Sequence, residues 1–163
     1  MNNDSQQICC PEFNPEPFEG KEFIWQDKLF IKEAIPQFFH IPLPWVFGKA
    51  VVRMFHKIEV AGAKPEEKDV LMLSYDPSPW RSELYMTTTK EVSDAENVKL
   101  SGTFLTRVFD GPYSAVPKWI KVMDKYVTEK GKTVKKYYFY YTTCPKCAKK
   151  YGKNYVVVFA QVN

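Results

Sequence analysis

A carboxylate and nearby aromatic side chains provide the clearest chemical signal in the sequence. Glu83 and Tyr85 lie two residues apart in a segment rich in strand-favouring residues, so their side chains leave the same face of a strand. A carboxylate between aromatic walls attracts a cation, and the rings add cation–π contacts of about 0.5–2 kcal/mol. In an apolar groove we expect the pKa of Glu83 to rise, which suits a general base that activates water. The alternative is that Glu83 forms an ion pair with Arg81 or a lysine at the surface.

The other candidate residues of this groove are aromatic. We expect Glu83 and Tyr140 to be the catalytic residues if the chain is an enzyme, and Trp80, Tyr85, Tyr113, Trp119 and Tyr138 to contact the ligand. Aromatic residues make up 16% of the chain, which is more than a core of this size needs, so some of them are available to line a cavity. The alternative is that these side chains fill the core.

The four cysteines form a second candidate site. Cys144 and Cys147 have the two-residue spacing that lets both sulfur atoms reach one tetrahedral ion, and Cys9 and Cys10 would complete a four-cysteine zinc site. Adjacent ligands are an unusual spacing, and the N-terminal segment would have to fold onto the last hairpin. Two other interpretations stay open, namely an oxidisable dithiol and small buried residues without chemistry.

Several familiar catalytic and nucleotide-binding motifs are missing. The chain has two histidines, His40 and His56, and no Gly-x-Ser-x-Gly elbow, Walker loop or dinucleotide-binding glycine pattern. The sequence therefore argues against a Ser-His-Asp or Cys-His hydrolase and against nucleotide chemistry.

Composition and charge limit the setting and the partners. No segment has the run of about 18 apolar residues that a membrane helix needs. The N-terminus lacks a secretory signal, so we expect a cytoplasmic protein without a membrane partner. Ten lysines lie between Lys121 and Lys153. We interpret them as a solvated face and regard nucleic acid as a poor candidate partner, since arginine, which usually supplies base contacts, is nearly absent there.

These residues must be positioned by strands and helices that recur in the same order. The first 27 residues, with Pro11, Pro15, Pro17 and Gly20, are expected to form an arm packed on one domain of residues 28–163. Apolar spacing predicts helices over Phe47–Ala61 and Val116–Val127, each ended by a glycine. Strands are expected at 28–41, 70–75, 83–89, 98–109, 136–143 and 154–162, with a lysine-rich loop before the last.

The order strand, helix, strand, strand thus occurs twice, in halves of about 28–97 and 98–163. Two such β-α-β-β units can join into one antiparallel-rich sheet with both helices on one face. We therefore expect an α+β fold whose other sheet face leaves a ligand groove between the halves.

The second half resembles a known family. Residues 100–113, which contain the turn Gly111-Pro112-Tyr113, precede a helix with Trp119, and this stretch resembles GyrI-like effector-binding domains. The stretch Tyr137–Tyr155 resembles a bacterial subgroup loosely labelled as hydrolases. The resemblance covers roughly residues 28–163.

This resemblance implies an aromatic groove that receives planar hydrophobic or cationic small molecules. It also implies possible hydrolysis of a strained electrophile such as a cyclopropane-bearing toxin. Many relatives carry a carboxylate in the penultimate strand, whereas residues 138–141 offer only aromatic side chains here. An alternative function is a zinc-stabilised interaction module that docks on an acidic protein or nucleic acid.

Overall fold

The computed structural model describes residues 12–142 and 145–163. Its elements in chain order are strand β1 (Lys21–Phe38), strand β2 (Ile41–Pro42), helix α1 (Pro44–Val60), a 3-10 turn (Glu67–Asp69), strands β3 (Met72–Ser78), β4 (Arg81–Thr87) and β5 (Glu96–Asp110), a 3-10 turn (Tyr113–Ala115), helix α2 (Val116–Glu129), strand β6 (Val134–Tyr141), helix α3 (Pro145–Tyr151) and strand β7 (Tyr155–Val162). The predicted α+β class with an antiparallel sheet is confirmed.

The sheet closes on itself, which the sequence did not predict. Its strand order is β1-β4-β3-β6-β7-β5, and β5 pairs back onto β1, so six strands form a barrel. The two-residue strand β2 extends the sheet beyond the end of β1. Instead of an open sheet with one free face, the protein has an inner and an outer barrel surface.

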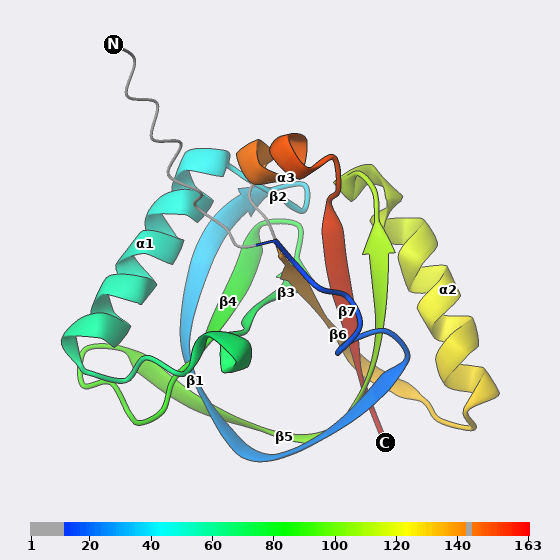
Figure 1. The fold of residues 1–163 in the computed structure, drawn as a ribbon, viewed down its shortest axis with the longest axis horizontal. Coiled ribbons are helices and arrows are strands. Elements are labelled where there is room, and N and C mark those ends of the chain that lie inside the picture. Colours follow the sequence, from blue (N-terminus) through cyan, green and yellow to red (C-terminus); the bar gives the residue numbers. More distant parts are fainter. Residues whose placement is uncertain (1–11, 143–144) are drawn as a thin grey trace.

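Closure depends on the length and curvature of β1 and β5. Their ladder runs from Lys21 opposite Thr106 to Lys32 opposite Glu96 and is interrupted by a register shift between Trp25 and Lys28. The two strands run together at the bottom of the view in Figure 1 and separate above it. After Lys32 in the sequence, β1 still pairs with β4 but no longer with β5. The closing ladder therefore ends at the Lys32–Glu96 pair.

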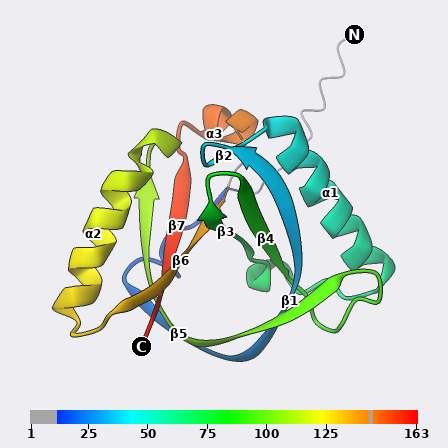
Figure 2. The ribbon, with the colours of Figure 1, turned by 180° about the vertical axis from the view of Figure 1, so that it is seen from behind.

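Helices α1 and α2 pack on the outer surface. Met54 and Ile58 of α1 are buried against outward residues of β1 and β4. Met123 and Val127 of α2 are buried against β5, β6 and β7. Both helices are on the same face of the sheet, as expected, but its curvature carries them to opposite flanks of the barrel (Figures 1 and 2). The interpretation of the two halves as copies of one module stays a prediction.

The barrel interior is a third, largely aromatic core. Phe30, Phe104, Tyr138 and Phe159 are buried in it, one each from β1, β5, β6 and β7. Aromatic side chains thus fill much of the space in which an open groove was expected.

The segment before β1 also packs on this interior. The ring centroid of Phe18 lies 5.9 Å from that of Phe23 and 6.1 Å from that of Phe159. The Phe18 carbonyl accepts a 2.5 Å hydrogen bond from Thr106 Oγ1. Glu19 accepts a 2.8 Å hydrogen bond from the backbone N–H of Val108. Strand β1 begins at Lys21, inside the stretch 1–27 expected to be an arm. The apolar alternation of Phe23 and Trp25 explains this earlier start.

One segment expected to be a loop is helical. Helix α3 occupies part of the lysine-rich stretch between the last two strands. Proline is well suited to the first turn of a helix, and the lysines and alanine that follow have good helix propensity. A high lysine content was therefore an unreliable indication of a loop.

Candidate functional site

Glu83 lies on the inner surface of the barrel, on β4. Only 9% of the residue is accessible to solvent. Its Oε2 atom lies 3.0 Å from Lys32 Nζ and accepts a 3.1 Å hydrogen bond from the Tyr85 hydroxyl. The predicted common face of Glu83 and Tyr85 is therefore present, and Lys32 on β1 is a third member of the cluster.

Tyrosine rings surround this carboxylate. Tyr85 and Tyr138 meet edge to face with centroids 5.7 Å apart, and Tyr75 lies 5.6 Å from Tyr138. Lys32 Nζ lies 6.0 Å from the centre of the Tyr85 ring, within the range of a cation–π contact. Strands β1, β3, β4 and β6 thus bring together one carboxylate, one ammonium group and three phenols.

The charge state of Glu83 differs from the expectation of a raised pKa. Burial does raise the pKa of this carboxyl group, but hydrogen bonds from Lys32 and Tyr85 and the positive charges of Lys32 and Arg81 lower it by more. The pKa of Glu83 is therefore below its ordinary value, and the group is ionised at neutral pH. A carboxylate stabilised in this way is a good cation ligand and a weak general base.

The neighbouring phenols are held in the neutral form. Burial and the adjacent Glu83 charge raise the pKa of Tyr85 well above its ordinary value. Burial, followed by the charges of Tyr75 and Glu83, raises the pKa of Tyr138 to about 12. At neutral pH both tyrosines are hydrogen-bond donors with apolar ring faces.

Tyr140 lies on the same inner face but packs with the N-terminal segment. Its ring is 6.0 Å from Phe13 and 6.1 Å from Phe18. Tyr138, two residues earlier, provides the β6 contact to Tyr85. The structure therefore brings Glu83, Tyr85 and Tyr138 together, with Tyr140 further along the barrel.

Three other predicted ligand contacts lie away from Glu83. Trp80 is 54% exposed beside Phe38 and Phe39 at the tip of the β3–β4 hairpin. Tyr113 is 47% exposed, with its ring 5.0 Å from that of Tyr141.

Trp119 is buried in the outer core of α2, where it stacks on Phe109 with ring centroids 5.4 Å apart. It belongs to the helix face that packs on the sheet, so its helical position alone explains its burial. This side chain contributes to packing on the outside of the barrel and not to its interior.

Sequence reasoning missed Lys32. It lies in a segment where apolar and charged residues alternate, which is typical of a strand with one face toward solvent. Its position beside Glu83 and Tyr85 depends on the β1–β4 register, which places Lys32 opposite Tyr85 and Ala34 opposite Glu83. A lysine partner for Glu83 was considered, but at the surface, whereas the Lys32 side chain is only 18% exposed.

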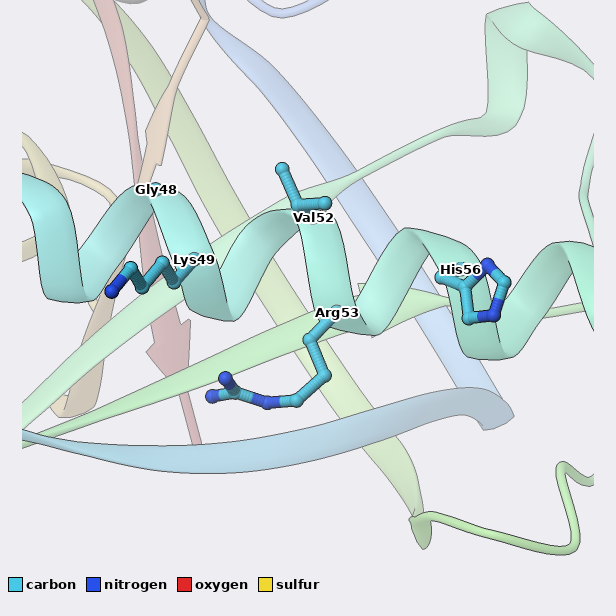
Figure 3. A pocket seen from close by; sticks show the side chains of 5 residues that line it. All are labelled: Gly48, Lys49, Val52, Arg53 and His56. Carbon is cyan, nitrogen blue, oxygen red and sulfur yellow. The ribbon is translucent and has the colours of Figure 1, made fainter.

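A hollow on the surface of α1 is lined by Gly48, Lys49, Val52, Arg53 and His56. Its volume is about 430 Å³ and it is widely open to solvent. All five residues belong to one helix, and Figure 3 shows Val52 and Arg53 pointing to different sides of it. Arg53 is already paired with Glu33 of β1. This hollow lacks the convergent polar groups of a binding site, in contrast to the Glu83 cluster.

The zinc prediction falls largely outside the described structure. Cys9, Cys10 and Cys144 lie outside the described residues, and the Cys147 side chain is likewise not described. Within residues 12–142 and 145–163, no group of three or more His, Cys, Asp or Glu side chains could hold a metal ion. Zinc binding by the cysteines therefore stays a prediction.

The fold and the cluster together define an α+β barrel with an ionised carboxylate among tyrosines. Residues 1–162 match the family described as bacterial hydrolase, and the chain belongs to that family. No curated protein matches the sequence.

Several solved structures share the fold. The C-terminal domain of EcmrR has 11% identity and a TM-score of 0.66, covering 90% of this chain and 98% of that one. A hydrolase from Listeria innocua has 12% identity and a TM-score of 0.64, covering 98% of this chain and 97% of that one. SAV2435 bound to tetraphenylphosphonium has 14% identity and a TM-score of 0.53, covering 89% and 94%. These similarities agree with the GyrI-like fold that the sequence resembles.

Two of the expectations about partners concern nucleic acid and the membrane. EcmrR has also been solved in complex with DNA, in a structure of which this chain covers 56%. The expectation that nucleic acid is a poor partner therefore stays a prediction. None of the described helices combines the length and the apolar character needed to cross a membrane.

Proposed function

We propose that the protein binds a hydrophobic, aromatic organic cation inside the barrel, with Glu83 as its counter-ion. The observation that carries the proposal is an ionised carboxylate, 9% exposed, in contact with tyrosine side chains. This carboxylate already holds the positive charge of Lys32 at 3.0 Å, so its surroundings suit a ligand that brings a positive charge and apolar surface together.

The surrounding rings support the same ligand class. Tyr75, Tyr85 and Tyr138 present aromatic faces and edges around the carboxylate. A delocalised cation gains cation–π attraction from such rings and buries its apolar area against them. A similarly folded protein, SAV2435, has been solved with tetraphenylphosphonium, which has this combination of charge and apolar surface.

Tetraphenylphosphonium is also a suitable test compound, and tetraphenylborate is its anion of matching shape. We expect the wild-type protein to bind the phosphonium and to prefer it over the borate. Glu83→Gln should weaken phosphonium binding by about tenfold or more, since about 1.4 kcal/mol of lost attraction has that effect. Isothermal titration calorimetry would measure both affinities.

Glu22→Gln is the matched control, because it removes one carboxylate from an exposed position of β1. Its affinity should equal that of the wild type. Equal affinities of wild type and Glu83→Gln would remove Glu83 from the site, and a wild-type protein that binds no phosphonium would contradict the proposed function itself.

Hydrolysis of a strained electrophile is a second candidate, favoured by the family to which the chain belongs. Glu83 is too acidic to be a strong base, but it could orient a water molecule or stabilise a developing positive charge. Incubation with a cyclopropane-bearing alkylating compound, followed by mass spectrometry, separates the candidates. Ring-opened, water-added product above the protein-free control supports turnover, whereas unaltered compound retained by the protein supports binding alone.

A further inference from the structure

Lys32 occupies the position that a bound cation needs. Its ammonium nitrogen lies 3.0 Å from Glu83 Oε2 and 6.0 Å from the centre of the Tyr85 ring. These are the two interactions that would recognise an organic cation, an ion pair and a cation–π contact. A ligand charge placed there would lie close to the lysine charge and be repelled by it.

A second carboxylate is available to Lys32 on its other side. Glu96 Oε1 lies 3.8 Å from Lys32 Nζ, and the two residues face each other in the last pair of the β1–β5 ladder. The Glu96 side chain is 62% exposed, whereas that of Glu83 is 11% exposed. Lys32 therefore stands between an inner and an outer carboxylate, at the point where the closing ladder ends.

The step from one carboxylate to the other is small. Lysine has a flexible four-carbon stem, so its ammonium group can approach Glu96 through side-chain rotation without movement of the strand. Leaving Glu83 costs an ion pair in a mostly buried position, and Glu96 supplies a solvated replacement.

We propose that Lys32 is a tethered competitor for the cation site, which neutralises Glu83 in the ligand-free protein and moves to Glu96 when a cation enters. This inference rests on the proposed function and makes it more specific. Because the tether keeps the ammonium at a high effective concentration, a small hydrophilic cation gains nothing by replacing it. Only a cation with a large apolar surface can offset the lost pair, so Lys32 selects lipophilic cations over small ammonium ions.

Substitution of Lys32 by an uncharged residue tests the competition. We expect Lys32→Met and Lys32→Gln to bind tetraphenylphosphonium at least about tenfold more tightly than the wild type. Both should also acquire measurable affinity for tetramethylammonium, which the wild type should not bind. Two replacements are used because Met leaves Glu83 with only the hydrogen bond from the Tyr85 hydroxyl among the contacts described above, whereas Gln can donate a second one. Circular dichroism would establish that each variant is folded.

Lys99→Met is the matched control, because it removes a lysine from an exposed position of β5. Its affinity for tetraphenylphosphonium should equal that of the wild type. A gain in this variant similar to that of Lys32→Met would mean that net charge, and not competition at Glu83, sets the affinity, and it would overturn the proposal.

Glu96→Gln tests the outer position of the ammonium. In the wild-type background it should weaken phosphonium binding, because the Lys32 ammonium then has no carboxylate to pair with once the cation occupies Glu83. Combined with Lys32→Met it should have little effect, so the two substitutions form a double-mutant cycle with a measurable coupling. Additive effects would overturn the movement to Glu96.

The outcomes separate the two proposals. Glu83-dependent phosphonium binding that is unchanged in both Lys32 variants would leave the proposed function intact and overturn the competition. Binding only in the Lys32 variants would contradict the proposed function and overturn the movement to Glu96, because the lysine would then block the site in the wild type. If neither the wild type nor the variants bind, the proposed function fails and the competition fails with it.

Discussion

The ionised state of Glu83 has a consequence for stability that does not depend on any ligand. Its pKa is lower in the folded protein than its ordinary value of 4.5. As the pH falls, Glu83 is therefore protonated in the unfolded chain before it is protonated in the folded protein. The stabilising contribution is therefore complete above about pH 4.5 and is lost as the pH falls through the folded-state pKa. We expect Glu83→Gln to lower the free energy of unfolding by about 1–3 kcal/mol at pH 7, because Lys32 loses its inner partner. The difference from wild type should shrink as the pH falls below about 4.5.

Urea unfolding at several pH values would measure this difference. Glu33→Gln is a useful comparison, because Glu33 pairs with Arg53 on the outside of the barrel, where the Arg53 side chain is 50% exposed. Its effect should be below about 1 kcal/mol at neutral pH. A Glu83→Gln penalty that persists undiminished at pH 3 would mean that the loss comes from packing and not from the charge.

Residue-level prediction succeeded where a signal was local. The two-residue spacing of Glu83 and Tyr85 was enough to predict their common face, and their hydrogen bond confirms that they are neighbours. Lys32 was missed because its contact with Glu83 is set by the register between two strands, which no local pattern encodes. The pKa direction of Glu83 was wrong for the same reason, since the missing partner carries the positive charge that lowers it.

At the scale of elements, the interruption in the β1–β5 ladder makes a specific demand on the backbone. Gly102 lies opposite Trp25, next to the register shift, with φ of +136°, and a Cβ atom there would lie 3.2 Å from Gln161 Nε2. We expect Gly102→Ala to destabilise the protein by about 1–3 kcal/mol, because alanine is strained at this φ. Gly48 lies within α1, where an added Cβ atom would meet no other atom within 4 Å, so Gly48→Ala should stabilise the protein by about 0.5–1 kcal/mol.

Thermal or urea unfolding of the two variants would measure these opposite signs. The pair controls for the methyl group itself, since both substitutions add the same atom and differ only in backbone conformation. A destabilisation of similar size in both variants would contradict the argument from the backbone conformation of Gly102.

The elements themselves were largely predictable, and their arrangement was not. Both long helices were recognised from apolar spacing, because each buries one stripe, with Met54 and Met123 near the centre of each. Closure of the barrel depends on pairing β1 with β5, strands separated by a helix and a hairpin. The sequence shows that each of these strands is long, but not which neighbour satisfies its second edge. The open groove was therefore an incorrect expectation, although its carboxylate was a correct choice for an inward position.

At the scale of the whole molecule, the two halves of the chain are joined along two seams. Strand β1 pairs with β5, and β3 pairs with β6, so each half completes the sheet of the other. The interior core also takes residues from both halves, including Phe30 and Tyr85 from the first and Phe104 and Phe159 from the second. Neither half could keep its inner surface buried if the other unfolded.

We therefore expect the protein to unfold as one cooperative unit, which a substitution far from α1 can test. Met123 is fully buried on the inner face of α2, and Met123→Ala should cost about 2–5 kcal/mol. In hydrogen exchange measured by mass spectrometry, this variant should lose protection in α1 to the same extent as in α2, wherever exchange occurs through global unfolding. Met54→Ala, on the buried face of α1, is the reciprocal variant and should reduce the protection of α2 equally. If each substitution lowered protection only in its own half, the halves would be separate folding units, and the shared interior core would contribute little to stability.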